Sequence, residues 1–504
     1  MNLAYVIKDG LAQTPDKVLF DGDGRQFTYA EVARLSENFG AGLAAHGYGI
    51  SARIAVVLPN IPEYGLAIYG IWRIGAEPVL INPQLTAPEL AYILQDAQAE
   101  AIILPDALLP VFETLRSQLP TLKVIVIGAE VPAGDLSFAA LVSTPGNCNI
   151  VERDPDDIAQ IMYTSGTTGQ PKGALVSHNN LFANAKAGIE FLSVTNNDHF
   201  FALLPVFHAF AFNGAFVLFP LAGGSTSFEY RYTPKKLITQ LSDPRYTVMA
   251  AVPSLLSTLM RLPEAFKLSP NMRCILSGGG ALPPALEQEF TARFGSIIRQ
   301  GYGMTECCPY AGCTPLHGPV KFGSVGVPFP QGHELGVRDP LSGAFLGNGQ
   351  VGELVVRGPH VFKGYWNKPQ ATADTFVDGW LRTGDLGYRD DDGYYFIVDR
   401  LKDMLIVGGE KVFSREVEDA LMTFPAIREV AIIGDPDPDK GELVHAYVSF
   451  KEGLSATEAE IIAFARTQLT AVKVPKKVTI LEDLPKSALG KILKRELRKM
   501  VVAI

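Results

Sequence analysis

The chain has 504 residues, of which 44 are Lys or Arg and 53 are Asp or Glu, so its formal charge is −9. This mild acidity argues against a nucleic-acid-binding protein, whose domains usually carry a basic surface. Hydrophobic residues make up 47% of the chain, and at about 150 residues per domain the length suggests about three structural units. Five cysteines in so long a chain fit a reducing compartment better than a disulfide scaffold, so the cytoplasm is expected.

The N-terminal segment and the most apolar stretch both argue against membrane targeting. Lys8 and Asp9 interrupt the start of the chain before a signal-peptide core could form. The most apolar stretch, 209–224, contains Asn213, Gly214 and Pro220 and is shorter than the ~20 apolar residues that span a bilayer. We therefore expect neither a signal peptide nor a transmembrane helix.

Helix and strand patterns alternate over the first 300 residues. Thr28 and Glu31 have the spacing of a capping box and predict a helix that ends near Gly47. A second alternating series runs from about 158 to 298, and such alternation predicts parallel α/β layers. The strand-like and helix-like runs that follow the first helix lie at 53–59, 63–74, 77–81, 88–94 and 100–104.

The pattern changes after Gly301 to short β-type runs that are broken by Gly and Pro. Alternation returns from about residue 403 and predicts a small α+β domain. The expected fold is therefore α/β, with a large N-terminal domain of two α/β subdomains plus a β-rich subdomain, and a small C-terminal domain. The elements expected in the C-terminal domain are a helix at 414–422 capped by Ser414, strands near 430–433 and 444–450, and a helix opened by Ser455 with Glu458.

The segment YTSGTTGQPKG at 163–173 carries the clearest chemical signal. Small residues let backbone amides approach a phosphate, hydroxyl groups add donors, and Lys172 supplies charge. The segment is not a Walker loop, because Lys172 is followed by Gly173 and not by Ser or Thr. A flexible linker is the structural alternative, but linkers seldom end in Pro-Lys-Gly. We interpret the segment as a triphosphate-binding loop.

This loop resembles that of the adenylate-forming acyl-CoA synthetases, which include coumarate ligases, luciferases and peptide-synthetase adenylation domains. Further matching segments follow in the order of that family across nearly the whole chain. They are LPVFHAF (204–210), SGGGALPP (277–284), QGYGMTE (300–306), GELVVRG (352–358), GYW (364–366), WLRTGDLG (380–387), VDRLKDMLIVGGEKV (398–412) and LPKSALGKILKREL (484–497).

The resemblance implies a two-step reaction that uses ATP and Mg²⁺, with CoA as co-substrate. A carboxylate and ATP give an acyl-adenylate and pyrophosphate, and a thiol then takes the acyl group while AMP leaves. It also implies an N-terminal adenylation domain at 1–401 and a C-terminal lid domain at 402–504, with the hinge at Lys402. After adenylation the lid would rotate and present Gly408 and Gly409 for thioester formation.

Each matched motif implies site residues. Glu306 and Thr168 would bind the metal, Thr305 would contact the α-phosphate, and Tyr302 would stack on adenine. Asp385 would bind the ribose hydroxyls, with Arg400 beside it. The full set implied for ATP and AMP is Thr164, Ser165, Gly166, Thr167, Thr168, Gly169, Lys172, Gly279, Gly280, Ala281, Leu282, Tyr302, Gly303, Met304, Asp385 and Arg400.

Two further residues are implied in catalysis. Lys491 would neutralise charge at the α-phosphate during adenylation, and His208 would gate the path of the thiol. As isolated residues each has an ordinary explanation: a solvated lysine for Lys491 and a core histidine for His208. Likewise, Asp385 and Arg400 by themselves would suggest a surface ion pair. The motif context favours the functional interpretation.

The acyl pocket is expected to be uncharged. Cys307, Cys308, Cys313 and His317 could suggest zinc, but adjacent cysteines do not match the usual ligand spacing, so pocket lining is the better account. Without Lys or Arg, the pocket favours a hydrophobic monocarboxylic acid, fatty or aromatic, over dicarboxylates such as malonate. The expected lining residues are Phe207, Phe210, Phe212, Asn213, Ala251, Val252, Gly278, Tyr302, Met304, Cys307 and Cys308.

Three functional hypotheses remain at this point. A free-standing acid–CoA ligase is preferred, an acyl-adenylate ligase that loads an acyl carrier protein is the alternative, and a non-catalytic nucleotide binder is the third. The segment 473–499 has nine Lys or Arg against three acidic residues, which fits either the phosphates of CoA or an acidic carrier protein. A solvated amphipathic helix explains the charges from Lys494 to Lys499 at least equally well. A homodimer is a further expectation.

Overall fold

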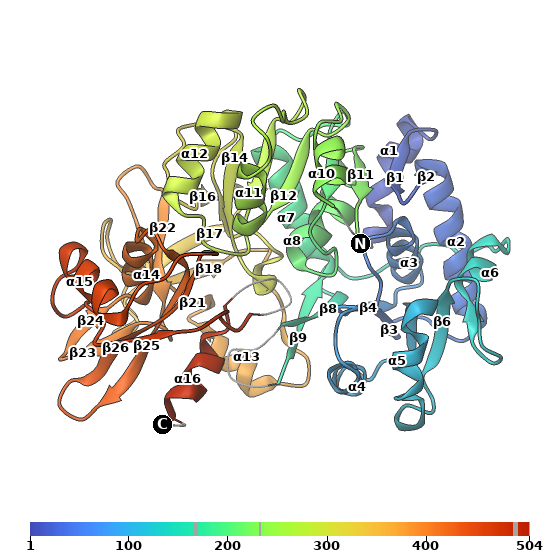
Figure 1. Cartoon of the computed structure of the whole chain (residues 1–504). Helices are drawn as coiled ribbons and strands as arrows, with labels where there is room; N and C mark the ends of the chain where they lie inside the picture. Colours follow the sequence, from blue (N-terminus) through green and yellow to red (C-terminus); the bar gives the residue numbers. More distant parts are fainter. Residues whose placement is uncertain (165–169, 231–232, 487–491, 503–504) are drawn as a thin grey trace. The chain divides into compact units, whose positions relative to one another are not determined.

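The computed structural model describes residues 1–164, 170–230, 233–486 and 492–502 (Figure 1). Contacts divide the chain into two units, which are described separately below. The first unit comprises Met1–Leu335 and Val356–Leu381, and the second comprises Gly336–Val355 and Arg382–Ile504. The predicted hinge at Lys402 concerns a movement, which contacts in one structure do not test, and it stays a prediction.

Two large sheets form the first unit, and both are mostly parallel. In spatial order, one sheet consists of β16 (Val327–Pro328), β15 (Gly312–Cys313), β14 (Ile298–Tyr302), β13 (Cys274–Ser277), β12 (Val248–Ala251), β10 (His199–Ala202), β11 (Ser225–Phe228), β1 (Val18–Gly22) and β2 (Arg25–Thr28). The other consists of β19 (Gly364–Tyr365), β9 (Lys172–Ser177), β8 (Ile158–Thr164), β4 (Glu77–Leu80), β3 (Arg53–Val56), β5 (Ala101–Pro105), β6 (Lys123–Ile127) and β7 (Leu136–Ser137).

Helices cover these sheets in layers (Figure 1). Helix α3 contacts strands of both sheets, while α4 and α5 pack on the eight-stranded sheet and α10 to α12 on the nine-stranded one. This architecture confirms the predicted α/β class. The helices of the unit are α1 (Lys8–Gln13), α2 (Tyr29–Ala45), α3 (Pro62–Arg73), α4 (Ala87–Asp96), α5 (Leu109–Glu113), α6 (Phe138–Ser143), α7 (His178–Phe191), α8 (Ala209–Asn213), α9 (Phe219–Leu221), α10 (Pro234–Leu241), α11 (Pro253–Met260), α12 (Pro284–Phe294) and α13 (Pro369–Thr375).

The β-rich texture after Gly301 corresponds to a five-stranded sheet, through whose strands the boundary between the units passes. A second five-stranded sheet forms the core of the C-terminal part, together with α14 (Ser414–Met422), α15 (Glu458–Gln468) and α16 (Lys494–Val502). The first sheet contains β17 (Glu334–Arg338), β18 (Gly352–Arg357), β21 (Trp380–Arg389), β20 (Phe376–Val377) and β22 (Tyr395–Arg400), and the second contains β24 (Glu410–Val412), β23 (Leu405–Val407), β26 (Gly441–Phe450), β25 (Ile427–Asp437) and β27 (Lys477–Ile480).

Local capping rules correctly predicted the N-cap of one helix, but they assigned the N-cap of two others to the wrong residue. Thr28 and Glu31 form the predicted capping box of α2. Helix α14 does begin at Ser414, but this residue lies inside the first turn, and its hydroxyl donates to Asp399 Oδ1 over 3.0 Å instead of capping the helix. The predicted cap at Ser455 is wrong by two residues, because α15 is capped by Thr457.

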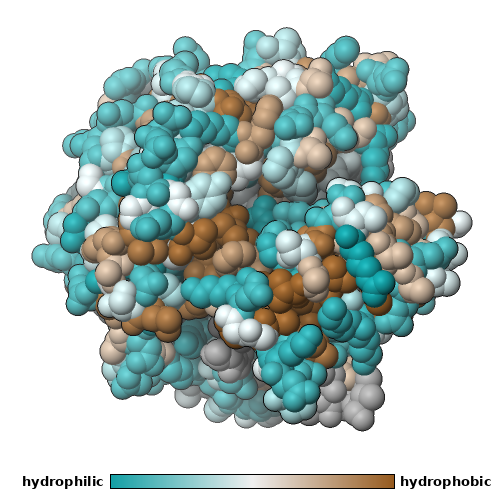
Figure 2. All heavy atoms as spheres, turned by 90° about the vertical axis from the view of Figure 1, so that its left-hand side faces the viewer, coloured by the Kyte–Doolittle hydropathy of each residue, from teal (hydrophilic) through white to brown (hydrophobic). Residues whose placement is uncertain are grey.

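In the parts of the chain that the structure covers, no helix has the length and apolar character needed to cross a bilayer. Figure 2 shows apolar patches among mostly hydrophilic side chains on one face of the molecule. Among the described residues of the second unit, Leu341 is the large apolar side chain with the highest exposed fraction, 90%. Phe345 on the same loop is 55% exposed.

Candidate active site

The hairpin of β8 and β9 carries the predicted phosphate loop. The strands are antiparallel, and Thr164 lies opposite Lys172 where the hairpin opens. Ser165, Gly166, Thr167, Thr168 and Gly169 lie outside the described residues. The two ends of the loop are therefore held at neighbouring positions of one sheet.

Helix α4 and the segment after β19 hold this hairpin in place. The Tyr163 hydroxyl donates to Asp96 Oδ2 over 2.6 Å, and the Trp366 indole donates to the Asp96 carbonyl over 2.8 Å. The Tyr92 hydroxyl donates to the carbonyl of Pro171, next to Lys172, over 3.1 Å. Burial and Asp96 raise the pKa of Tyr163, so its hydroxyl stays protonated and able to donate.

Tyr365 contacts two predicted site residues of opposite charge. Its hydroxyl donates to Glu306 Oε1 over 2.7 Å, and the Lys172 ammonium lies 5.0 Å from the centre of its ring. Burial and the charge of Glu306 raise the pKa of Tyr365 well above its usual range. The structure thus brings the loop cation and the predicted metal-binding carboxylate to one aromatic side chain.

The residues predicted to surround adenine come from β13, β14 and the turns after them. Gly279, in the turn after β13, has a φ of 74°, which favours glycine, and Leu282 is buried. Tyr302 ends β14 and is 7% exposed. Gly280, Ala281, Gly303 and Met304 lie in the same two turns, and Thr305 begins a short 3-10 turn that contains Glu306.

Gly303 is required by a close approach of the backbone. A Cβ atom at this position would lie 1.7 Å from the Pro309 carbonyl oxygen. We expect Gly303→Ala to lower the free energy of unfolding by about 1–3 kcal/mol, because the turn that carries Glu306 would have to move. Urea unfolding measures this effect. Gly49→Ala is the matched control, since nothing lies within 4 Å of a Cβ there, and equal effects of the two substitutions would contradict the prediction.

His208 precedes α8, and its half-buried side chain is a neutral imidazole. Burial lowers its pKa to about 4, and its ring centre lies 4.4 Å from that of Phe207. Among the described residues, its Nε2 atom has no hydrogen-bond partner. Buried polar atoms usually have a partner, but His333 Nε2 and both ring nitrogens of His360 also lack one among the described residues. The unpaired nitrogen is compatible with a contact to a ligand but does not set His208 apart from these histidines, and the role as a gate stays a prediction.

The residues predicted for the acyl pocket do not all have the same neighbours. Phe210 packs edge-on against Tyr310, and a Cβ at Gly278 would lie 3.2 Å from the Phe210 ring. Phe212 packs against Trp72 and Phe216 in the aromatic core of the unit. The remaining predicted lining residues are either buried (Asn213, Ala251, Tyr302, Cys307 and Cys308) or half-buried (Phe207, Val252 and Met304).

Asn213 connects this region to the segment after Glu306. Its amide donates to the Cys308 carbonyl over 2.8 Å and to Asn184 Oδ1 over 3.2 Å. Burial raises the pKa of the Cys308 thiol well above its usual range, so this thiol stays protonated. The packing of Phe212 and the bonds of Asn213 explain these two residues structurally, and their assignment to the pocket wall stays a prediction.

In the second unit, Asp385 and Arg400 lie opposite each other on β21 and β22 and form an ion pair of 3.0 Å. The Lys402 carbonyl accepts from Arg498 over 3.3 Å, and burial lowers the pKa of the Lys402 ammonium. Gly408 and Gly409 form the two-residue turn between β23 and β24, with φ of 60° and 84°. Lys491 lies outside the described residues.

The basic segment 473–499 is partly neutralised within its own unit. Lys494 pairs with Glu418 over 2.7 Å, Arg498 with Asp403 over 2.5 Å, and Lys473 with Glu416 over 2.5 Å. The two pairs made by Lys494 and Arg498 hold α16 against α14 and the segment after Lys402. These bonds assign a structural function to part of the charge that the sequence suggested for CoA or a carrier protein.

The residues near the phosphate loop fit Mg²⁺ bound through the nucleotide. Within the described ranges, no three His, Cys, Asp or Glu side chains converge as a metal cage. Glu306 instead offers one buried carboxylate beside the loop, and Mg²⁺ is commonly held by one or two carboxylates together with substrate phosphates. The other predicted ligand, Thr168, belongs to the part of the loop that is not described.

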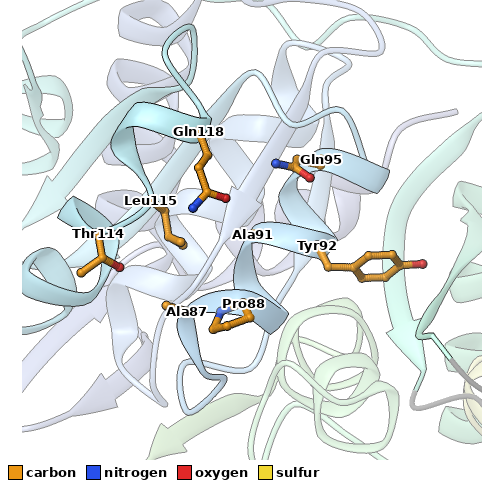
Figure 3. Close-up of a pocket in the computed structure, with 8 residues that line it drawn as sticks. All are labelled: Ala87, Pro88, Ala91, Tyr92, Gln95, Thr114, Leu115 and Gln118. Carbon is orange, nitrogen blue, oxygen red and sulfur yellow. The ribbon is translucent and has the colours of Figure 1, made fainter.

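A separate surface hollow of about 450 Å³ lies beside α4 (Figure 3). Its eight lining residues carry no charge and include none of the predicted site residues. In Figure 3, Gln95 and Gln118 lie at the hollow, while Tyr92 points away from the other lining residues. Tyr92 is the residue of this group that contacts the phosphate hairpin.

Sequence reasoning missed Tyr365 and Asp96. Tyr365 lies within the matched segment GYW, so the motif was a signal, but nothing local assigns its partner. Asp96 ends an ordinary amphipathic helix and lies in no motif. Both residues act on the phosphate hairpin through contacts with distant parts of the chain.

Comparisons with known proteins agree with this arrangement. The AMP-binding enzyme family matches residues 7–366, and the AMP-binding enzyme C-terminal domain matches 416–491. A long-chain-fatty-acid–CoA ligase of Bacillus subtilis is 33% identical over 98% of this chain and 94% of its own length. A feruloyl-CoA synthase of an Amycolatopsis species is 35% identical over 94% of each chain.

The crystal structure of ATP-bound MatB from Rhodopseudomonas palustris superposes with a TM-score of 0.91, at 31% identity over 99% of each chain. Both the resemblance and the fold class inferred from the sequence are thereby confirmed. The chain belongs to the AMP-binding enzyme family and is an adenylate-forming acid–CoA ligase.

Proposed function

We propose that this enzyme activates a hydrophobic monocarboxylic acid, fatty or aromatic, and transfers the acyl group to CoA. The support for the substrate class is that the predicted acyl region holds Phe, Ala, Val, Cys, Met and Tyr side chains with a single amide, Asn213. An uncharged, largely apolar lining favours an apolar acyl body and offers no partner for a second carboxylate. The two named relatives act on a long-chain fatty acid and on a feruloyl group.

The observation that best supports the first step is that Lys172 and Glu306 both contact Tyr365, the former at its ring and the latter at its hydroxyl. In that step a carboxylate oxygen attacks the α-phosphorus of ATP, and the bond to pyrophosphate breaks. Lys172 would neutralise phosphate charge, while Glu306 would hold Mg²⁺, which supplies further charge neutralisation when bound. Lys491 is proposed to neutralise the charge that develops at the α-phosphate.

In the second step the thiol sulfur of CoA attacks the acyl carbon, the thiol proton is lost, and the bond to AMP breaks. His208 is proposed to lie along the path of the thiol, because its half-buried imidazole is neutral near pH 7 and its Nε2 atom has no partner among the described residues. Asp385 and Arg400 are proposed to bind the ribose, with Gly408 and Gly409 at the thiolation surface. A role for a homodimer stays a prediction.

The test is the release of pyrophosphate and AMP with ATP, Mg²⁺ and CoA across a panel from butyrate to palmitate, together with benzoate, coumarate and malonate. We expect at least one hydrophobic monocarboxylate to give AMP and an acyl-CoA, and malonate to give neither. Turnover of malonate alone would contradict the proposed substrate class.

The acceptor is tested in the same assay. Pyrophosphate release without an acyl-CoA product would favour the second candidate, an enzyme that loads an acyl carrier protein. Adding a phosphopantetheinylated carrier protein to that reaction would then yield the acylated carrier. Formation of acyl-CoA without any carrier protein supports the acid–CoA ligase.

A further inference from the structure

Tyr365 is held firmly on the strand next to the phosphate hairpin. β19 pairs with β9 so that Gly364 lies opposite Leu175 and Tyr365 opposite Ala174, two positions along β9 from Lys172. The Tyr365 amide donates to Thr372 Oγ1 over 2.9 Å. Gly364 has a φ of 125°, and a Cβ there would lie 2.5 Å from the Thr372 side chain. The backbone that carries Tyr365 therefore has little freedom.

The same segment also holds Glu306 at two points. The Phe362 amide donates to the Glu306 carbonyl over 2.9 Å and fixes its main chain. The Tyr365 hydroxyl donates to the Glu306 carboxylate over 2.7 Å and fixes one of its two oxygens. Glu306 itself lies in a 3-10 turn of three residues, Thr305–Cys307. The segment from Phe362 to Tyr365 therefore contacts both the main chain and the carboxylate of Glu306 from outside its own turn.

The aromatic ring of Tyr365 acts on Lys172. An ammonium within about 6 Å of a ring centre is attracted by the negative face of the ring, and Lys172 lies at 5.0 Å. A long lysine side chain otherwise samples many rotamers, so this contact restricts where its charge lies.

We propose that Tyr365 is a positioning residue for the first step: its hydroxyl orients Glu306 toward the metal, and its ring orients Lys172 toward the nucleotide phosphates. This inference rests on the proposed roles of Glu306 and Lys172 in binding ATP and Mg²⁺. Tyr365 would be a further residue of the ATP site, one that acts on the nucleotide and the metal through Glu306 and Lys172. Partners of this kind orient metal ligands through hydrogen bonds, and their loss typically lowers metal affinity 10- to 100-fold.

The test is ATP binding, measured by isothermal titration calorimetry with and without Mg²⁺, in the absence of acid and CoA. Tyr365→Phe removes the hydroxyl and keeps the ring. We expect this variant to lose about 10-fold or more of the gain in ATP affinity that Mg²⁺ gives the wild type, with little change in metal-free ATP affinity. Tyr365→Leu removes both groups and is expected to weaken metal-free ATP binding as well.

Tyr29→Phe is the matched control. The Tyr29 hydroxyl is buried and donates to the Gly224 carbonyl over 2.7 Å, so this variant also loses a tyrosine hydrogen bond. We expect it to keep the wild-type response of ATP binding to Mg²⁺. An equal loss in Tyr29→Phe and Tyr365→Phe would show a general effect on folding and would overturn the proposal.

A double-mutant cycle with Glu306→Gln tests whether Tyr365 acts through Glu306. If it does, adding Tyr365→Phe to Glu306→Gln changes the response to Mg²⁺ no further. Additive effects, or a Tyr365→Phe variant with the wild-type response, would overturn the proposal. Wild-type protein that binds no ATP at all would instead contradict the proposed function, so the two failures are distinguishable.

Discussion

Lys491→Ala is expected to lower the rate of acyl-adenylate formation at least about 100-fold while leaving ATP binding largely intact. The physical reason is that the proposed role of the ammonium is to neutralise charge that develops at the α-phosphate, a contribution that is larger in the transition state than in the bound substrate. The measurement is pyrophosphate exchange, with ATP affinity determined separately by calorimetry. Lys491→Arg keeps the charge but changes the shape and reach of the side chain. Its rate of pyrophosphate exchange is expected to lie between those of the wild type and Lys491→Ala.

Two controls separate this role from a general loss of structure. Lys499→Ala removes a lysine of α16 whose side chain is 72% exposed, and is expected to behave as the wild type. In addition, Lys491→Ala supplied with acyl-adenylate and CoA is expected to form acyl-CoA, because the lysine is proposed to act only in the first step. Normal pyrophosphate exchange in Lys491→Ala would remove the assigned role.

Acidification is expected to destabilise the protein between pH 6.5 and about 4, because three histidines stay neutral in the folded state over this range but become protonated in the unfolded chain. Burial lowers the pKa of His178 to about 3 and the pKa values of His199 and His208 to about 4. In the unfolded chain these groups have a pKa near 6.5. The unfolded state therefore binds more protons in this range, and the free energy of unfolding falls as the pH falls. For three such groups the slope reaches about 4 kcal/mol per pH unit.

Buried carboxyl groups oppose part of this effect, since burial raises the pKa values of Glu63, Glu77 and Glu287. A raised carboxyl pKa stabilises the folded state as the pH falls through that pKa. The histidine contribution is therefore isolated by substitution. Urea unfolding of His178→Asn from pH 7.5 to 5 should show a pH dependence of the free energy of unfolding that is weaker than in the wild type, with a difference in slope that approaches about 1.4 kcal/mol per pH unit below pH 6. An unchanged slope would contradict the assignment to His178.

The phosphate loop, the order of its companion motifs and the alternation of helices and strands were all predictable from the sequence. Each depends on neighbours in the chain: the small residues between Tyr163 and Gly173, or the capping box of Thr28 with Glu31. The family followed from these motifs, because their residue types and order agree with its chemistry. The sequence did not identify one acid as substrate, since pocket shape is not a local property.

The helix caps show where local rules stop. Ser455 with Glu458 and Thr457 with Glu460 have the same spacing, so the sequence offered two equivalent starts for α15. The structure uses Thr457 with Glu460, and the Glu458 carboxylate accepts from the Val478 amide of β27 over 2.8 Å. Glu458 thus has a partner on a strand twenty residues away, which the local pattern does not reveal.

The sequence by itself determined which chemical groups this enzyme carries and the order in which they follow one another. Only the tertiary structure decided how those groups are held. Tyr365 reaches Glu306 across 59 residues, and Tyr163 reaches Asp96 across 67. Periodicity and motif spacing constrain side chains within a few turns of the same element, whereas partners on different strands and helices meet only when the sheets and their covering helices have packed.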